Sequence, residues 1–249
     1  MEAIVLCGGF ATRLEPISFF MPKPLLPIGS RPIIDYIADS LQKIGIKRII
    51  ISTNKKFAGQ FRYWMANKKA NGFPVPFELI VEPTTKNEEK FGAVNGINYA
   101  IKSLQINDDV IIVAGDNYYS FDLTSAFEKF KKLMKPTVML CDVKSKEEAK
   151  RFGVAVVREH KIEEFEEKPA EPKTTTVSTG IYMLPHDILC KFDEYILNRN
   201  NPDAPGHFLK WLVTNSKVYG FECNGEWFDI GTIDTYRKVF DSHNEAEAK

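Results

Sequence analysis

The chain has 249 residues, of which 44% are hydrophobic and 27% charged, and its 33 basic and 33 acidic side chains give a formal net charge of +0. That balance argues against a general nucleic-acid-binding protein, whose affinity would depend on a basic excess. No segment has the ~20 apolar residues that cross a bilayer, and the short N-terminal apolar run lacks the preceding basic residues of a signal peptide. We therefore expect a cytoplasmic protein that binds neither nucleic acid nor a membrane.

The first predicted elements form a strand–helix–strand unit. Residues 4–7 are apolar throughout, which is typical of a strand buried in a parallel sheet. Pro32 suits the first turn of a helix, and apolar residues at helical spacing follow it up to residue 44. Residues 48–53 are the next apolar run. Because parallel neighbouring strands need a crossover of this kind, these segments predict a βαβ unit.

The alternation of strands and helices continues as far as residue 114. In order, the sequence predicts a helix at 57–65, a strand at 77–81, a polar loop at 82–90, a helix at 93–104 and a strand at 109–114. This pattern predicts an α/β fold with a Rossmann-like, doubly wound, mostly parallel sheet. Ligands of such sheets bind at the carboxyl ends of strands, where Gly8-Gly9 and Gly115-Asp116 stand in this chain.

The second half of the chain is expected to contain shorter elements. They are strands at 137–143, 179–184 and 217–222, a hairpin of 153–158 and 161–166, a short helix opened by a capping box of Ser145 and Glu148, and helices at 185–197 and 232–240. No repeat or low-complexity linker separates them from the first half. We therefore expect one domain over residues 1–249, with a small β-rich insertion in its second half.

The loop after the first strand carries the strongest chemical signal. A strand that runs into Gly8-Gly9 can present backbone N–H groups to phosphate, and Arg13 and Lys23 supply two cations for a polyphosphate. The loop is not a Walker A motif, which needs Lys and Ser or Thr directly after its last glycine. It is not a dinucleotide fingerprint either, because GxGxxG fails at Ala11.

The stretch GGFATRLEP, followed by six residues and KPLLPIG, resembles the signature of the sugar-1-phosphate nucleotidylyltransferases, also called NDP-sugar pyrophosphorylases. Further motifs follow in the order of that family, namely Gly92-Ala93, Gly115-Asp116, Glu167-Lys168-Pro169, Ser178-Thr179-Gly180 and the segment from Trp227 to Thr232. They extend over nearly the whole chain. On these residues the chain is identified as a member of the family.

The resemblance implies a fold, a reaction and a division of labour along the chain. The fold is that of the nucleotide-diphospho-sugar transferases, which is GT-A-like. The reaction joins a nucleoside triphosphate to a sugar 1-phosphate, giving a nucleotide-sugar and pyrophosphate. Residues of about 1–120 would bind the nucleotide and residues of about 121–249 the sugar. The left-handed β-helix domain that many relatives append is not expected here.

The resemblance also assigns roles to single residues of this sequence. Arg13 and Lys23 would be catalytic, holding the β- and γ-phosphates and the α-phosphate respectively. Asp116 and Asp229 would hold Mg²⁺, which usually takes one or two carboxylates together with phosphate oxygens. The nucleotide would be bound by Leu6, Gly8, Gly9, Glu82 and Gly92. The sugar phosphate would be bound by Gly153, Glu167, Lys168 and Thr179.

Two departures from the family pattern bear on the substrate. Ala11 replaces a glycine of the phosphate loop, and Glu82 stands where many uridylyl- and thymidylyl-transferring members have Gln. A carboxylate only accepts hydrogen bonds, whereas an amide also donates them, so the base preference is open. We expect UTP or dTTP with glucose 1-phosphate, and mannose-1-phosphate guanylyl transfer is the alternative.

A catalytically silent paralogue that binds a nucleotide-sugar and regulates a partner is the competing function. Such a protein would be expected to lose the phosphate-loop Arg or Lys or a metal-binding Asp. All four of these residues, Arg13, Lys23, Asp116 and Asp229, are present, which favours the enzyme. The sequence leaves a homo-oligomer open.

Overall fold

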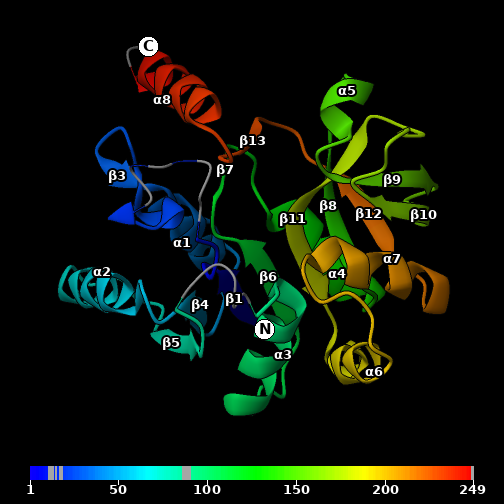
Figure 1. Ribbon diagram of the computed structural model, residues 1–249, viewed down its shortest axis with the longest axis horizontal. Helices are drawn as coiled ribbons and strands as arrows, with labels where there is room; N and C mark the ends of the chain where they lie inside the picture. The colour runs from blue at the N-terminus through cyan, green and yellow to red at the C-terminus, as the bar shows by residue number, and fades with distance from the viewer. Residues whose placement is uncertain (11–13, 15, 17–18, 86–90, 248–249) are drawn as a thin grey trace. The chain divides into compact units, whose positions relative to one another are not determined.

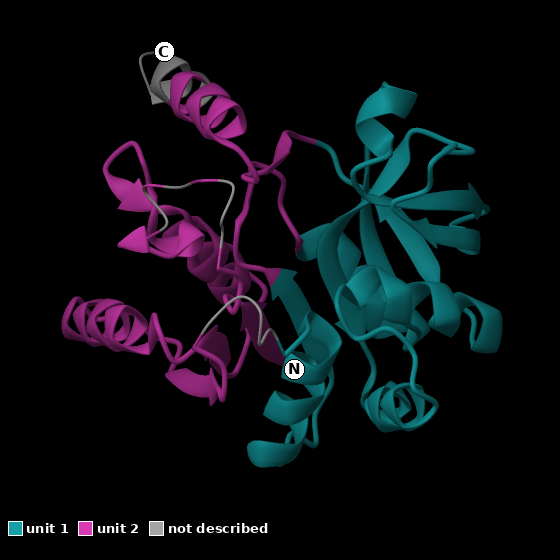
Figure 2. Ribbon diagram, viewed as in Figure 1, with its two compact units in different colours: residues 1, 91–113, 124–224 teal, residues 2–90, 114–123, 225–249 magenta. Residues whose placement is uncertain are grey.

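The computed structural model describes residues 1–10, 14, 16, 19–85 and 91–247 (Figure 1). The chain divides into two compact units (Figure 2). Unit 1 comprises residue 1 and residues 91–113 and 124–224, and unit 2 comprises residues 2–90, 114–123 and 225–249. The units interleave in the sequence, so neither coincides with a division at about residue 120. Among the described residues, no helix is both long and apolar enough to span a membrane.

Unit 2 contains a parallel sheet in the order β5 (Phe77–Glu82), β4 (Ile49–Asn54), β1 (Glu2–Leu6). Helix α1 (Ile33–Lys43) joins β1 to β4, and α2 (Ala58–Ala70) joins β4 to β5. Every residue of β4 is buried, as the apolar run predicted for an interior strand. The predicted βαβ unit is confirmed, and its register aligns the carboxyl ends of the three strands.

The remaining elements of unit 2 include a strand of the C-terminal segment that pairs with residues 117–119. They are η3 (Lys23–Leu25), β2 (Pro27–Ile28), β3 (Arg31–Pro32), β7 (Asn117–Tyr119), β13 (Trp227–Asp229) and α8 (Ile233–Glu247). Strand β13 pairs antiparallel with β7, and Asp229 lies opposite Asn117. This pairing sets Asp229 beside the residue that follows Asp116.

Unit 1 contains a mixed sheet of shorter strands. Their order is β6 (Val110–Ala114), β11 (Thr176–Leu184), β8 (Thr137–Asp142), β12 (Tyr219–Glu222), β10 (Lys161–Glu167) and β9 (Gly153–Arg158). Strands β8 and β12 are parallel, and the other neighbours are antiparallel. The hairpin β9–β10 turns at Glu159 and His160, which both have positive φ. A type I′ turn, the usual two-residue connection of a hairpin, requires positive φ at both of its central residues. The parallel pairing that the sequence predicts is therefore found in the sheet of unit 2, whereas most neighbouring strands of unit 1 are antiparallel.

The helices of unit 1 are more numerous than the sequence predicted. They are α3 (Ala93–Ser103), α4 (Thr124–Leu133), α5 (Lys146–Ala149), η5 (His186–Ile188), α6 (Lys191–Leu197) and α7 (Pro205–Asn215). The helix predicted at 185–197 is divided into η5 and α6. Helix α7 begins with Pro205, and Phe208 on it stacks on Phe192 with ring centroids 4.0 Å apart. This aromatic contact fixes α7 to α6.

Candidate functional site

The loop after β1 is held by the polar end of β4. The Cys7 amide donates to the Ser52 carbonyl at 2.7 Å, the Thr53 hydroxyl donates to the Cys7 carbonyl at 3.2 Å, and the Asn54 amide donates to the Gly8 carbonyl at 3.0 Å. Ser52, Thr53 and Asn54 are fully buried. These three residues were not predicted as part of the site, although a polar run that ends an apolar strand was a visible signal.

Lys23 and Asp116 meet beside this loop. Lys23 Nζ lies 3.2 Å from Asp116 Oδ2, and the two side chains are 16% and 33% exposed. Together with Leu6, Cys7, Gly9 and Pro24 they line a cavity of about 70 Å³. The sequence placed these two residues 93 positions apart, and the fold makes them an ion pair that a small anion can reach.

Gly115 makes the approach of Asp116 to the loop possible. Its amide donates to the Leu6 carbonyl at 3.0 Å. A Cβ atom at this position would lie 2.7 Å from Cys7 Sγ, 2.8 Å from the Leu6 carbonyl oxygen and 3.2 Å from Pro24 Cγ. Because no real Cβ atom tolerates two such contacts, a side chain here would push Asp116 away from Lys23.

Asp229 is brought to Asp116 by the backbone. The Ile230 amide donates to the Asp116 carbonyl at 3.1 Å, within the pairing of β13 with β7. Both carboxylates are half-buried. Among the described residues, no three His, Cys, Asp or Glu side chains gather as a metal-binding group. Two carboxylates supply the hard oxygen donors that suit Mg²⁺, which completes its shell with water and phosphate oxygens. Arg13 and Ala11 lie outside the described residues.

The Glu82 side chain lies against Gly8 of the loop that follows β1. It ends β5, opposite Asn54, and is only 8% exposed. Ser52 Oγ donates to its Oε1 at 3.0 Å. Burial raises the pKa of this carboxyl group, and the hydrogen bond from Ser52 opposes part of that rise. A Cβ atom on Gly8 would lie 2.8 Å from both carboxylate oxygens, so the glycine leaves the space that Glu82 occupies.

Gly92, in unit 1, has a backbone requirement that explains its place in the motif. Its φ is +84°, and a Cβ atom would lie 2.6 Å from the Pro202 carbonyl oxygen. The next two amides bond to the same loop, Ala93 to the Asp203 carbonyl at 3.1 Å and Val94 to the Pro202 carbonyl at 3.0 Å. The glycine therefore starts α3 against the loop before α7.

We expect Gly92→Ala to lower the free energy of unfolding by about 2–4 kcal/mol, because it adds left-handed strain to a clash with backbone. Urea unfolding measures this. The matched control is Gly59→Ala on α2, where a Cβ atom would meet nothing within 4 Å. That change should stabilise the helix by about 0.5–1 kcal/mol. An equal effect of the two substitutions would contradict the assigned backbone role.

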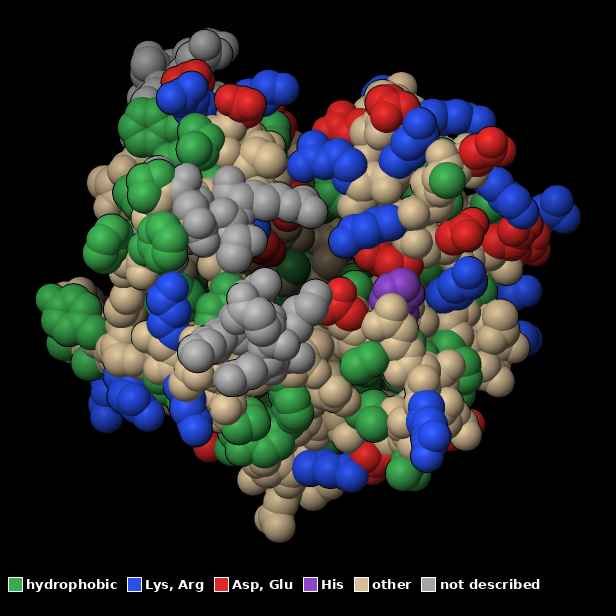
Figure 3. All heavy atoms as spheres, in the orientation of Figure 1, with side chains coloured by type: hydrophobic (Ala, Val, Ile, Leu, Met, Phe, Trp, Pro, Cys, Tyr) green, Lys and Arg blue, Asp and Glu red, His purple; other side chains and the backbone are tan. Residues whose placement is uncertain are grey.

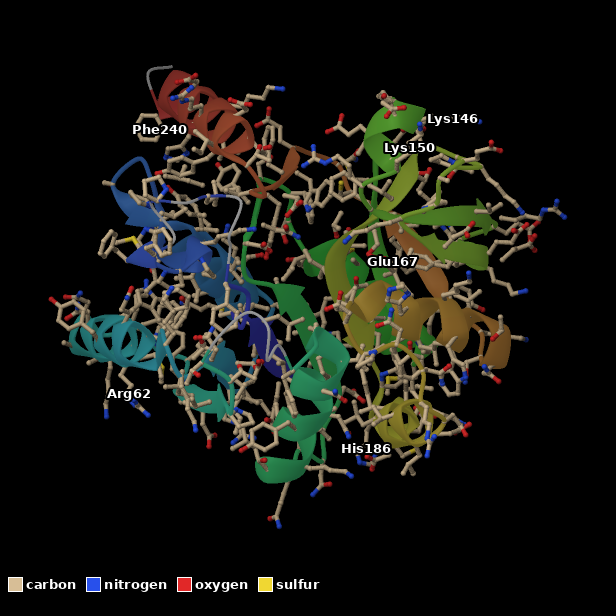
Figure 4. The ribbon with its side chains drawn as sticks, in the orientation of Figure 1. Arg62, Lys146, Lys150, Glu167, His186 and Phe240 are labelled. Atoms are coloured by element: carbon tan, nitrogen blue, oxygen red, sulfur yellow. The ribbon has the colours of Figure 1, made fainter. Side chains whose placement is uncertain are left out.

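Glu167 is enclosed by two glycines of unit 1. It ends β10 opposite Gly153, and its side chain is 10% exposed. Glu167 is labelled in Figure 4. A Cβ atom on Gly153 would lie 2.9 Å from Glu167 Oε2, and one on Gly206 only 1.8 Å from it. Gly206 belongs to the first turn of α7, where the helix dipole favours a negative charge. The sequence did not identify Gly206, because α7 itself was not predicted.

Replacing Gly206 with Ala should displace the Glu167 carboxylate and leave the backbone in place, since the clash is with the end of a flexible side chain. If Glu167 binds the sugar, the KM for sugar 1-phosphate should rise by about 10- to 100-fold, the value of one charge-assisted hydrogen bond. The KM for the triphosphate should stay within about twofold. Steady-state kinetics in both substrates separates the two constants. A rise in the KM of the triphosphate alone would contradict this role.

Burial raises the pKa of Glu167, the nearby Asp203 raises it further, and Lys168 and His207 lower it. A carboxyl group whose pKa is higher in the folded than in the unfolded state stabilises the fold below its unfolded pKa, and this contribution is lost as pH rises through the folded pKa. Glu167→Gln should therefore gain stability over the wild-type chain as pH rises from about 4 to 7. Urea unfolding at several pH values measures the difference, and a difference that shrinks with rising pH would contradict the prediction.

The two other predicted sugar-binding residues lie in contrasting environments. Lys168 is 61% exposed, has a positive φ and lies 3.9 Å from Glu167 Oε1 through its Nζ. Thr179 is fully buried, and its hydroxyl donates to the Met139 carbonyl at 3.0 Å. The Thr179 side chain thus joins β11 to β8, and its contact with a sugar stays a prediction. On the face shown in Figure 3, basic and acidic side chains are intermixed.

Comparison with known proteins identifies relatives of this chain and a family that matches it. The family described as nucleotidyl transferase matches residues 2–246. A protein of Sulfolobus acidocaldarius, provisionally described as a mannose-1-phosphate guanyltransferase, is 30% identical over 246 residues, which cover 96% of this chain and 62% of the relative. A glucose-1-phosphate adenylyltransferase of Mycoplasma mobile is 31% identical over 255 residues, which cover 95% and 65%. This chain therefore spans less than two thirds of the length of these relatives.

A solved structure shares the fold along nearly its whole length. It is a Bacillus anthracis protein, provisionally described as a glucose-1-phosphate thymidylyltransferase and solved in complex with a sucrose. The identity is 27%, the TM-score is 0.82, and the match covers 98% of this chain and 95% of that one. The α/β fold class predicted from the sequence is confirmed by this match. Because the family match extends over residues 2–246, the chain belongs to the nucleotidyl transferase family.

Proposed function

We propose that the chain transfers a nucleotidyl group from a nucleoside triphosphate to a sugar 1-phosphate, giving an NDP-sugar and pyrophosphate. The ion pair of Lys23 and Asp116 beside the Gly8-Gly9 loop carries this proposal, in a chain that matches the nucleotidyl transferase family from residue 2 to 246. Both groups suit phosphate chemistry, the ammonium as a counter-charge and the carboxylate as a metal ligand.

The reaction is an in-line displacement at the α-phosphorus. An anionic oxygen of the sugar 1-phosphate forms the new P–O bond, and the bond to the β-phosphate oxygen breaks as pyrophosphate leaves. The attacking oxygen carries no proton, so no general base is needed. Catalysis then depends on positioning and charge neutralisation. Lys23 would neutralise charge at the α-phosphate, and Arg13 would hold the departing phosphates.

Asp116 and Asp229 would hold Mg²⁺ through their carboxylates. The paired backbones of β7 and β13 keep the two residues together, and their oxygens are the donors that this ion prefers. When bound, the metal ion would neutralise phosphate charge and polarise the reacting P–O bonds. The ammonium of Lys23 keeps Asp116 in place through the hydrogen bond to Oδ2.

The sugar would be bound by groups of unit 1. The buried Glu167 carboxylate would accept hydrogen bonds from sugar hydroxyls, and the exposed ammonium of Lys168 would meet the sugar phosphate. Gly153 would leave room for Glu167, as its position against this side chain requires. We propose that Leu6, Gly8 and Gly9 contact the nucleotide, and a nucleotide contact of Gly92 stays a prediction. Residues 1–249 would form one nucleotidylyltransferase domain.

Glucose 1-phosphate is the first sugar to test and mannose 1-phosphate the second, with UTP, dTTP and GTP as nucleotides. Pyrophosphate release should require Mg²⁺ and both substrates, and at least one pair should turn over. A coupled phosphate assay with each triphosphate against each sugar 1-phosphate measures this. If no pair releases pyrophosphate while an NDP-sugar still binds, the chain is a silent nucleotide-sugar-binding protein, and the proposed function is wrong.

A further inference from the structure

Glu82 is a buried acceptor with more capacity than its surroundings use. The side chain is 8% exposed, and in the described part of the chain the Ser52 hydroxyl is its one hydrogen-bond donor, at 3.0 Å to Oε1. A carboxylate offers about four acceptor positions on two oxygens. Leaving such a group buried with one partner is costly, and a ligand with donor groups would offset that cost.

The position of Glu82 relative to the phosphate loop decides which part of a nucleotide it can meet. Gly8 lies against its carboxylate, because a Cβ atom there would be 2.8 Å from both oxygens. Asn54, opposite Glu82 in the sheet, holds the Gly8 carbonyl. Beyond Gly8, the loop lines the cavity that contains Lys23 and Asp116. A nucleoside that lies beside Gly8 would therefore meet the Glu82 carboxylate.

The backbone around Cys7 lies between the two carboxylates. A Cβ atom on Gly115, the residue before Asp116, would lie 2.7 Å from Cys7 Sγ, and one on Gly8, the residue after Cys7, would lie 2.8 Å from both Glu82 oxygens. Asp116 and Glu82 therefore flank the same short stretch of the loop within unit 2.

The bases differ in what they can offer a carboxylate. Guanine presents two neighbouring donors on one edge, N1–H and the N2 amino group. Uracil and thymine present a single N3–H between two carbonyl oxygens, which would face the carboxylate oxygens with like partial charge. Adenine and cytosine present an amino group next to a ring acceptor. Two parallel charge-assisted hydrogen bonds to one carboxylate are therefore available only to guanine among these bases.

We propose that Glu82 selects a guanine nucleotide, its two carboxylate oxygens accepting from N1–H and N2–H₂ of the base. This inference rests on the proposed function, since it places the nucleotide of that reaction on the Gly8-Gly9 loop. It makes GTP the triphosphate of this chain in place of UTP or dTTP. Glu82 is then a specificity-determining residue of the nucleotide site.

The binding constants of triphosphates test the proposal directly. Titration calorimetry of the full chain with Mg²⁺ should give GTP binding that is about 10²-fold or more tighter than that of UTP, dTTP, ATP or CTP. Inosine triphosphate, which lacks only the N2 amino group, should bind about 10- to 100-fold more weakly than GTP, because it loses one of the two hydrogen bonds. Equal binding of the inosine and guanine nucleotides would overturn the bidentate contact.

Glu82→Gln should reverse the preference. The amide keeps the size of the side chain but offers one acceptor and one donor, a pattern that matches N3–H and a carbonyl of uracil. The ratio of GTP to UTP affinity should fall by about 10²-fold, whereas a general structural defect would weaken both nucleotides equally. The matched control is Glu78→Gln on the same strand, whose carboxylate bonds to Arg48 at the opposite end of β5. That variant should keep the wild-type ratio.

The outcomes separate this inference from the proposed function. If UTP or dTTP binds as tightly as GTP, or if Glu82→Gln leaves the ratio unchanged, the assignment of guanine is wrong even where pyrophosphate is released. If GTP is preferred and the preference depends on Glu82, the assignment stands even where no sugar 1-phosphate gives turnover. A chain that binds none of the five triphosphates would contradict both.

Discussion

Asp116→Asn should lower the rate of pyrophosphate release by about 10³-fold at saturating substrates, because it removes the charge that would hold Mg²⁺ against the phosphates. The amide has the shape of the carboxylate and can still accept from Lys23, so the loop around Gly115 should keep its packing. A titration with Mg²⁺ should show a weaker requirement that saturates at higher concentration. Full Mg²⁺-dependent turnover in this variant would contradict the metal assignment.

Asp142→Asn is the matched control for that substitution. Asp142 also ends a strand and also bonds to a lysine, Lys144, at 2.7 Å. These contacts and a hydrogen bond from Thr175 lower its pKa to about 2. The variant should lose some stability above about pH 4, the pKa of the unfolded carboxyl group, with a smaller loss as pH falls towards the folded value, and it should keep its turnover within about twofold. Comparing the turnover of Asp116→Asn with that of Asp142→Asn shows whether the loss of any strand-end carboxylate lowers turnover or only the loss of the one beside the Gly8-Gly9 loop.

Lys23→Met should lower turnover by about 10²- to 10³-fold, the typical loss when one preorganised donor to a reacting group is removed. The Lys23 side chain is 16% exposed, and methionine would preserve most of its packing. The rate constant should fall more than the KM for sugar 1-phosphate rises, since the charge at the α-phosphate grows during the reaction. Turnover within about twofold of wild type would remove Lys23 from the mechanism.

The double variant Lys23→Met with Asp116→Asn tests whether the two residues act together. Groups that form one unit lose little more when both are removed than when one is. The double variant should therefore be close in rate to Asp116→Asn alone. Fully additive losses would mean that the ion pair of the free chain has no part in the bound state.

The parallel half of the fold could be predicted from the sequence because its signals are local. Apolar runs in β1 and β4 and helical periodicity in α1 specify the βαβ unit without knowledge of distant residues. Helix α7 was not predicted, because the polar, proline-bearing loop before it was extended as far as Gly206; in the structure its Phe208 packs on Phe192 and on Tyr195. The segment nevertheless has helical spacing, because Phe208, Leu209 and Leu212 are buried on one face after Pro205 at the first turn, so this helix could have been predicted.

The residues of the candidate site likewise divide into those that the sequence predicted and those that only the folded chain shows. The motif residues Lys23 and Asp116 were predicted, and the structure brings them into contact. Gly206 was not predicted, since its function is to leave space for Glu167, 39 positions earlier, and only the folded chain shows that space. Thr179 was predicted as a sugar contact from its motif, and its hydroxyl is bonded within the sheet. A motif gives the position of a residue but not the direction of its side chain.

Two buried carboxylates illustrate how a site can reduce stability. Burial raises the pKa of both Glu82 and Glu167, so each destabilises the fold when it is ionised at neutral pH. Their partners within the described chain are few, and substrate donors would complete them in the proposed reaction. The stability that Glu→Gln variants gain at these positions and the selectivity that they lose should go together.

The fate of the oxygen atoms tests the central claim most directly. The chain is supplied with Mg²⁺, a nucleoside triphosphate and a sugar 1-phosphate whose phosphate oxygens carry ¹⁸O, and the products are weighed by mass spectrometry. Attack by the sugar phosphate on the α-phosphorus predicts an NDP-sugar that contains all of the label and pyrophosphate that contains none. Label in the pyrophosphate, or pyrophosphate released with a nucleoside monophosphate and no NDP-sugar, would contradict the proposed reaction.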